Sequence, residues 1–317
     1  MDSIPLYYHP TQLVFVDDSR NFLDAIDITL AKKDFICTTF IDPFQAIDYI
    51  NQKREDLQES FISSSSIPTD KQHTEFDISS IHKMLYQPKR FNTISTVIVD
   101  YDMPSINGLK LCEQLTYKDP SIILLTGEAS QSLAIQAFNK KIIGQFISKS
   151  RKDLPIPLIK ALDASKLDYF IRITQPIAKY IISNPNIRTF LENPHYISQF
   201  YDIIKELHII EFYIISPEGD FLLIPKEGPP KLLFVQDEEK IQANKDDLYL
   251  QDPSLANTHL FCYHLKYGEP IDSIKNPQSY FYPKVAIPGS DLFYAISPAG
   301  SFLSKTEFLK FHDTRCE

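Results

Sequence analysis

Residues 96–108 read TVIVDYDMPSING and carry the clearest structural signal in the chain. The run Thr96–Val99 is short and almost wholly apolar, which is typical of a parallel strand buried on both faces. Asp100 follows this run directly. A buried strand that ends in a carboxylate predicts an acidic group at the carboxyl edge of a parallel sheet, where open α/β proteins bind their ligands.

The same pattern recurs on both sides of this stretch. Four further runs are predicted strands: Leu13–Val16, Phe35–Phe40, Ser121–Leu125 and Ile142–Ile147. Segments with apolar residues at helical spacing lie between them, and one of these opens at Pro43. Strands that alternate with helices predict a parallel sheet wound by right-handed crossovers.

Polar residues collect just past the ends of these strands. They are Asp17, Asp18, Asp100, Thr126 and Lys149. Three carboxylates at one edge would repel one another unless a hard cation lies among them, and Mg²⁺ prefers oxygen ligands. A lysine and a threonine hydroxyl supply what a phosphoryl group needs, and a carboxylate can act as the nucleophile that forms an aspartyl-phosphate.

The residues at these strand ends resemble the signature sites of two-component receiver domains. The run Asp100–Gly108 resembles the phosphoacceptor motif, and Asp17-Asp18, Thr126-Gly127-Glu128 and Phe146–Lys149 match the remaining sites in the same order. The resemblance covers about residues 8–165. It implies an α/β flavodoxin-like receiver with a five-stranded parallel sheet of order 2-1-3-4-5.

The resemblance also implies roles for individual residues. Asp100 would accept a phosphoryl group from a sensor histidine kinase, a phosphotransfer protein or a small phosphodonor. Asp18, Asp100 and the backbone carbonyl of Asp102 would hold Mg²⁺, with Asp17 acting through water. Lys149 would bind the phosphoryl group.

Two further residues are implied in switching. Thr126 would move toward the phosphoryl group, and Phe146, three residues before Lys149, fits the aromatic switch of the family. The face built from the fourth helix, fifth strand and fifth helix would then repack and form a phosphorylation-dependent homodimer. Local physics agrees, because phosphorylation adds charge and acceptor oxygens that Thr126 and Lys149 can reach.

Two features depart from the family pattern. Ser150 follows Lys149 where the family usually has proline, and the gap between Asp18 and Asp100 is nearly twice the usual one. The excess lies at about residues 54–92, where Ser63–Ser66 predicts a loop and the spacing of apolar residues over 78–85 predicts one added helix. The long second-helix region and the motif at Asp100 also resemble the quorum-sensing response regulators of Legionella.

The second half predicts a different architecture. We expect the receiver domain at 1–155, its fifth helix extended as a helical connector at 156–175, and an α+β domain with a mainly antiparallel sheet at 176–317. Three prolines nine residues apart predict short helices at 177–183, 186–192 and 195–207. A hairpin over residues 211–224 and strands at 232–235, 259–265, 280–286 and 291–296 follow, with helical segments at 237–247 and after Ser301. This order weakly resembles a PAS module.

Composition limits the functions of both halves. The chain has 317 residues, a formal net charge of −9 and only 8 glycines. The acidic balance argues against binding to a phosphate backbone, and no two glycines are close enough for a P-loop or a dinucleotide-binding loop. No run reaches the ~18 apolar residues of a membrane span, no signal-peptide core is present, and the 4 cysteines form no paired motif. These features predict a soluble cytoplasmic protein without a membrane partner.

Several clusters in the second half have more than one interpretation. His259, Cys262 and His264 suggest a metal site, but alternation along a strand turns His259 away from the other two. The aromatic residues Tyr280-Phe281-Tyr282 and Phe293-Tyr294 are typical of a sheet core and would also suit stacking on a base.

Three functions follow from these observations. The first is a response regulator that is switched by phosphorylation of Asp100, with no separate enzymatic output beyond its own phosphorylation and dephosphorylation. The second is a ligand-sensing or protein-interaction regulator that uses the receiver for docking. The third is a nucleic-acid-binding regulator, which the acidic charge disfavours.

Overall fold

The chain divides into two compact units. The computed structural model describes residues 3–31, 35–58, 81, 85–127, 131–242, 260–262, 281–283 and 285–299. The N-terminal unit comprises Pro5–Ala178, and the C-terminal unit comprises the described part of Lys179–Lys305 with the residues before Pro5. Each unit has its own sheet.

The N-terminal unit is built on a parallel sheet of five strands. After a two-residue strand β1 (Tyr7–Tyr8), these strands are β2 (Gln12–Val16), β3 (Ile36–Phe40), β4 (Ile94–Asp100), β5 (Ser121–Thr126) and β6 (Gln145–Ser148). Their spatial order is β3-β2-β4-β5-β6, and every neighbouring pair is parallel. The predicted order 2-1-3-4-5 is confirmed.

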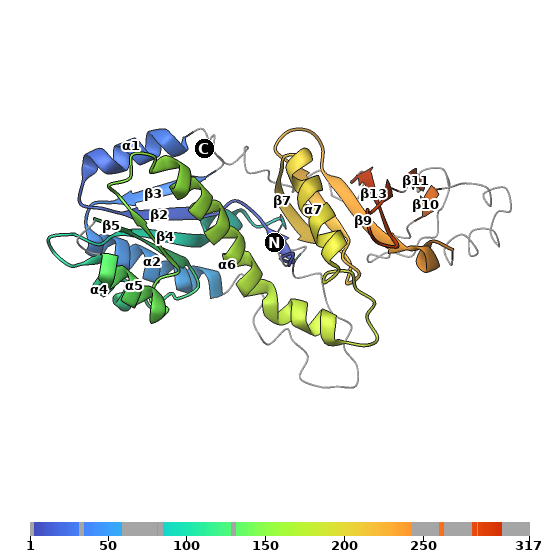
Figure 1. Cartoon of the computed structure of the whole chain (residues 1–317), viewed down its shortest axis with the longest axis horizontal. Helices are drawn as coiled ribbons and strands as arrows, with labels where there is room; N and C mark the ends of the chain where they lie inside the picture. Colours follow the sequence, from blue (N-terminus) through green and yellow to red (C-terminus); the bar gives the residue numbers. More distant parts are fainter. Residues whose placement is uncertain are drawn as a thin grey trace. The chain divides into compact units, whose positions relative to one another are not determined.

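Helices cover both faces of this sheet (Figure 1). They are α1 (Arg20–Leu30), α2 (Pro43–Gln58), the 3-10 helix η2 (Pro88–Asn92), α4 (Gly108–Gln114), α5 (Gln131–Asn139) and α6 (Pro155–Ser183). Side chains alternate along each strand, so Leu13 and Phe15 pack with α1 and α6, whereas Val14 and Val16 pack with α2, α4 and α5. This explains why the strands are apolar on consecutive positions.

The last strand of this sheet begins later than the sequence predicts. The prediction was Ile142–Ile147, but Ile142 donates its backbone N–H to the carbonyl of Ala137 at 3.0 Å and so closes the end of α5. Lys141 has a positive φ of 58° at the same turn. The backbone N–H of Ile142 is therefore part of a helix cap and not of a β-ladder, and the β5–β6 pairing begins at Gln145.

The helix α6 runs past the point where the sequence predicts a break. A new helix was expected to begin at Pro176, but α6 continues through this proline to Ser183. Proline removes one hydrogen bond from the helix interior and typically costs about 3 kcal/mol. Ile177 and Ile181 are buried beyond it, and burying two such side chains offsets this cost.

The predicted helix at 186–192 is wrong, because these residues form turns and irregular backbone. Phe190 donates its N–H to the carbonyl of Glu218 at 2.8 Å, and Arg188 forms ion pairs with Asp237 and Glu239. Contacts with distant residues hold this segment in place of intrahelical hydrogen bonds.

The C-terminal unit combines one helix with an antiparallel sheet. Its elements are α7 (Pro194–Glu206), β7 (Ile209–Ile214), β8 (Phe221–Pro225), β9 (Lys231–Asp237), β10 (Leu260–Cys262), β11 (Phe281–Pro283), β12 (Val285–Ala286) and β13 (Leu292–Pro298). Within the unit the strands follow the order β7-β8-β9-β13-β12, and β10 pairs with β11 separately. All described pairs are antiparallel, as predicted.

Aromatic side chains form the core of this unit. Phe200 on α7 packs its ring 5.1 Å from that of Phe212 on β7 and 4.7 Å from that of Phe221 on β8, measured between ring centres. Tyr196, one turn earlier on α7, donates its hydroxyl to the carbonyl of Gly219 in the β7–β8 turn. The predicted helix at 195–207 and the predicted hairpin are confirmed.

Some predictions concern residues outside the described part of the chain. These are the serine loop, the helix after Ser301 and the outer parts of the segments at 237–247 and 259–265. Residues 81 and 85 are helical, in the region of the added helix, and residues 238–242 are helical. Among the described residues, no helix combines the length and apolarity needed to cross a bilayer.

Candidate functional site

The carboxyl edge of the parallel sheet gathers the five strand-end residues. Asp17 and Asp18 come directly after β2, Asp100 ends β4, Thr126 ends β5 and Lys149 follows β6. Because all five strands run parallel, these positions lie at one edge.

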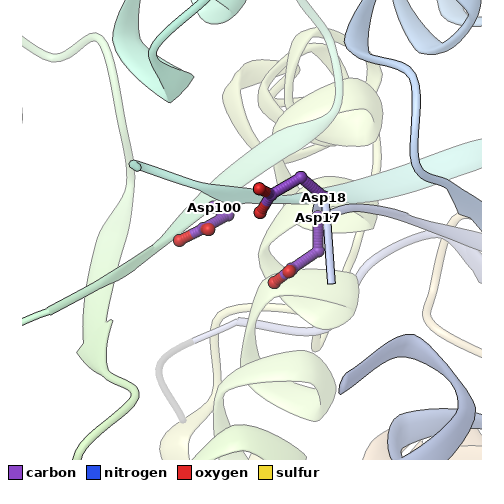
Figure 2. Close-up of side chains that lie close together, drawn as sticks. All are labelled: Asp17, Asp18 and Asp100. Carbon is purple, nitrogen blue, oxygen red and sulfur yellow. The ribbon is translucent and has the colours of Figure 1, made fainter. Parts of the chain in front are cut away.

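Three carboxylates lie together at this edge (Figure 2). Oxygen atoms of Asp17, Asp18 and Asp100 all lie within 4.8 Å of one another. Asp17 and Asp100 are buried, at 1% and 4% exposure, whereas Asp18 is exposed. The cluster therefore opens toward solvent on the side of Asp18.

Lys149 supplies the balancing positive charge. Its Nζ lies 2.6 Å from Oδ2 of Asp17 and 2.8 Å from Oδ2 of Asp100. Its backbone N–H donates to the carbonyl of Thr126 at 2.9 Å, which fixes the start of the side chain at the end of β6. Lys149 thus bridges two of the three acids.

Burial disfavours the charged form of the Asp17 carboxyl. Loss of water raises its pKa, while the hydrogen bond and charge of Lys149 and the backbone N–H of Ser19 act in the opposite direction. The Ser19 N–H lies 3.0 Å from Oδ1 of Asp17. Asp17 is therefore fixed by contacts through both of its oxygens.

Thr126 and Asp102 border the cluster. The Thr126 hydroxyl is buried and donates to the carbonyl of Gly127 at 2.5 Å. Asp102 is exposed, and its Oδ2 lies 3.6 Å from where a β-carbon on Gly127 would stand. Phe146 is partly buried and packs on the face of the sheet that carries α2, α4 and α5.

The motif that begins at Asp100 ends in Gly108, where the backbone packs too closely for a side chain. A β-carbon at Gly108 would lie 2.3 Å from the backbone carbonyl oxygen of Asp100, so any residue with a side chain would force the backbone here to shift. Asn107 caps α4 by accepting the N–H of Lys110 at 2.9 Å. Glycine therefore lets α4 begin directly against the backbone of the acidic site.

Comparison with known proteins agrees with this geometry. Residues 73–156 match the family model described as the response regulator receiver domain. The N-terminal unit is a receiver domain.

The whole chain also has a structural relative. It is similar to the response regulator LqsR of Legionella pneumophila, with 28% sequence identity and a TM-score of 0.79 over 100% of this chain and 96% of that chain. A receiver domain in a chain that resembles a response regulator places this protein in two-component signalling.

Other similarities are much lower. An adenylate cyclase from Rhodopirellula baltica is 18% identical over 55% of this chain and 99% of that one, with a TM-score of 0.36. The chemotaxis protein CheY4 of Vibrio cholerae is 18% identical over 49% of this chain and 98% of that one, with a TM-score of 0.30. These scores carry no weight for function, and no curated protein matches the chain.

The donor set of the receiver domain fits a hard divalent cation. Carboxylate oxygens converge from two strand ends, and the opening lies at the exposed Asp18. Mg²⁺ takes oxygen ligands, usually one or two carboxylates with several waters. The predicted ligands Asp17, Asp18 and Asp100 are therefore brought together by the fold.

One neighbour of the receiver site was missed in the sequence. The ring of Phe22, in the first turn of α1, lies with its centre 4.7 Å from Nζ of Lys149. In the sequence, Phe22, Ile26 and Leu30 follow one another at helical spacing, which predicts only the apolar face of a helix. No signal in the sequence relates Phe22 to a lysine beyond the fifth strand.

The sequence also suggested a His/Cys cluster and an aromatic cluster in the C-terminal unit, and the structure describes only part of each. His259 and His264 lie outside the described residues, and so does Tyr280. Phe293 and Tyr294 lie on β13 and are partly buried.

Proposed function

We propose that the receiver domain is phosphorylated on Asp100 in a reaction that requires Mg²⁺. The observation that carries this proposal is the arrangement of Lys149 between Asp17 and Asp100, at 2.6 and 2.8 Å, with Asp18 beside them. A lysine held between two acids is a ready counter-charge for a phosphoryl group that arrives on one of them.

The reaction is a displacement at phosphorus. A carboxylate oxygen of Asp100 forms a new bond to phosphorus while the bond to the donor breaks, and the leaving group takes the electron pair of that bond. The donor is a phosphohistidine of a kinase or phosphotransfer protein, or a small acyl phosphate. When bound, Mg²⁺ would neutralise the charge of the transferring group at Asp18, Asp100 and the Asp102 carbonyl.

The chain's own residues then respond to the phosphoryl group. Lys149 binds one of its oxygens, and the Thr126 hydroxyl exchanges the Gly127 carbonyl for another. The movement of Thr126 leaves space that the ring of Phe146 enters. We propose no further enzymatic activity for the chain beyond forming and hydrolysing this aspartyl-phosphate.

We further propose that phosphorylation promotes a homodimer through α5, β6 and α6. Exposed apolar side chains on these helices support this choice. They include Ile135 and Phe138 on α5, at 50% and 49% exposure, and Ile156 on α6 at 63%. The output would then be a change in what the C-terminal unit binds. The link to quorum sensing stays a prediction from the sequence resemblance.

Phosphorylation is tested with acetyl phosphate and Mg²⁺, followed by intact mass measurement. The wild-type chain should gain the mass of one phosphoryl group, and Asp100→Asn should gain none. Asp24→Asn is the matched control, because Asp24 is an exposed aspartate on α1 away from the acid cluster. Equal labelling of Asp100→Asn and wild type would contradict the proposal.

The dimer is tested by light scattering with and without beryllium fluoride and Mg²⁺. Ile135→Glu should remain monomeric while it still accepts a phosphoryl group. Ile28→Glu should dimerise like wild type, because Ile28 is also exposed, at 75%, but lies on α1. A wild-type chain whose mass in solution ignores beryllium fluoride would refute the dimer.

A further inference from the structure

The ammonium group of Lys149 has neighbours from three separate elements. Asp17 follows β2, Asp100 ends β4, and the ring of Phe22 belongs to the first turn of α1. Lysine has a long flexible side chain, and the side chain of Lys149 is 23% exposed. These neighbours therefore decide where its charge lies.

The two acidic neighbours are not constant partners. If the proposed reaction occurs, Asp100 becomes an acyl phosphate, and a bound divalent cation would place a second positive charge near the carboxylate of Asp17. Both ion pairs of Lys149 then change. Among the described residues, Phe22 is the neighbour that remains, and an aromatic face attracts an ammonium group without competing for phosphoryl oxygens.

The ring of Phe22 is well placed for this task. Phe22 is partly buried and packs against the core between the sheet and helices α1 and α6. Ser19 caps α1 by accepting the N–H of Phe22 through its side chain and its backbone carbonyl. Packing against this core and the cap by Ser19 therefore fix the position of the Phe22 ring, which lies beside the ammonium group of Lys149.

We propose that Phe22 is a positioning residue of the receiver domain: its aromatic face holds the Lys149 ammonium at the acidic site before and after phosphoryl transfer. The proposal rests on the proposed phosphorylation of Asp100 for its role in the reaction. The contact itself exists in the unphosphorylated chain, so the two can be tested separately.

The first experiment measures the accessibility of Lys149 without Mg²⁺ or a phosphodonor. The full chain is treated briefly with an amine-acylating reagent, and acylation of the Lys149 peptide is quantified by mass spectrometry. Phe22→Leu keeps an apolar side chain and removes the aromatic face, so Lys149 should react about two- to fivefold faster. Phe22→Tyr keeps the face and should react like wild type.

A matched control separates this effect from general loosening. Phe44 lies in the first turn of α2 and is half exposed, and Phe44→Leu should leave the reactivity of Lys149 unchanged. Equal Lys149 reactivity in wild type and Phe22→Leu would overturn the proposal. So would an equal increase in Phe22→Leu and Phe22→Tyr, because that result indicates packing and not the aromatic face.

The second experiment measures phosphorylation rates with acetyl phosphate at saturating Mg²⁺. Phe22→Leu should be slowed about two- to fivefold while its affinity for Mg²⁺ stays unchanged, and Phe22→Tyr should recover the wild-type rate. A wild-type chain that is never phosphorylated refutes the proposed function, yet the reactivity of Lys149 still tests the contact. A normal rate in Phe22→Leu overturns the positioning role.

Discussion

A buried histidine makes the stability of the receiver domain sensitive to mild acid. His9 is fully buried, and its Nδ1–H donates to the carbonyl of Pro10 at 2.9 Å. Burial lowers the pKa of His9 to about 3; the Pro10 hydrogen bond opposes this shift, and the charges of Arg90 and Lys166 add to it. The ring packs edge-on against Phe170, with ring centres 4.9 Å apart.

The sign and size of the effect follow from proton linkage. Histidine in the unfolded chain has a pKa of about 6.5, so below this pH the unfolded state takes up a proton that folded His9 refuses. Stability therefore falls as the pH drops from about 6.5 toward 3, by about 1.4 kcal/mol per unit. Between pH 7.5 and pH 5 the loss due to His9 is about 2 kcal/mol, a large part of a typical folding free energy.

Hydrogen exchange of the full chain measures this loss for the receiver domain alone. The free energy of opening is compared at pH 7.5 and pH 5 for peptides that cover β2 and β4. The comparison is made between wild type and His9→Phe, which keeps an aromatic ring against Phe170. Because all other titrating groups are shared, wild type should lose about 2 kcal/mol more than the variant.

A direct titration checks the same reasoning. The imidazole signal of His9 should not change in NMR spectra between pH 8 and pH 5, because its pKa lies at about 3. An equal loss of stability in both chains, or a His9 signal that titrates near pH 6.5, would refute this reasoning.

Two further predictions concern packing. Gly108→Ala should destabilise the receiver domain by about 1–3 kcal/mol and slow phosphorylation, because its β-carbon would lie 2.3 Å from the Asp100 carbonyl oxygen. Gly127→Ala is the control: its β-carbon would lie 3.6 Å from Oδ2 of Asp102, so the free energy of unfolding should change by less than about 0.5 kcal/mol. Urea unfolding of both variants checks this, and equal losses would contradict it. Phe200→Ala should cost the C-terminal unit about 3–5 kcal/mol by calorimetry, since Phe200 is fully buried, whereas Val285→Ala at an exposed site should cost under about 0.5 kcal/mol.

The sequence predicted the parallel sheet because burial on both faces leaves a local signal. Leu13–Val16 and Thr96–Val99 are buried at every position, so an apolar run without alternation was enough to identify them. The end of each run then placed a polar residue at the site. This is why Asp17, Asp100 and Lys149 could be predicted as site residues without any knowledge of side-chain contacts.

Interactions between distant residues left no such signal. The segment 186–192 has apolar residues compatible with a helix, yet its backbone is held by the carbonyl of Glu218. The helix α6 passes Pro176 because apolar side chains beyond the proline are buried. In each case a tertiary contact outweighs the local preference.

The candidate site shows the same division between local and distant information. The motif residues occupy fixed offsets from strand ends, so their convergence follows from a parallel sheet. Phe22 reaches Lys149 only because α1 folds back along the sheet. A single sequence cannot reveal such a contact, since any large apolar residue at position 22 would fit the helix pattern equally well.

The contribution of one hydrogen bond to the free energy of the proposed switch can be estimated for the hydroxyl of Thr126. It already donates to the carbonyl of Gly127, so phosphorylation must exchange a neutral acceptor for a charged one. Hydrogen bonds to charged groups contribute about 1.5–3 kcal/mol against about 0.5–1.5 for neutral ones. The gain of about 1–1.5 kcal/mol shifts a two-state equilibrium about tenfold.

Tenfold is too little to convert a domain that is almost wholly in one state, because complete reversal needs a differential affinity of about 10⁴. The remainder has to come from other contacts that differ between the two states. In the proposed switch, Lys149 would exchange Asp17 and Asp100 for a doubly charged phosphoryl group, and fuller burial of the partly buried ring of Phe146 would add an apolar contribution. The proposed switch therefore depends on these three residues together, and the loss of any one should leave a chain that is phosphorylated but only partly converted.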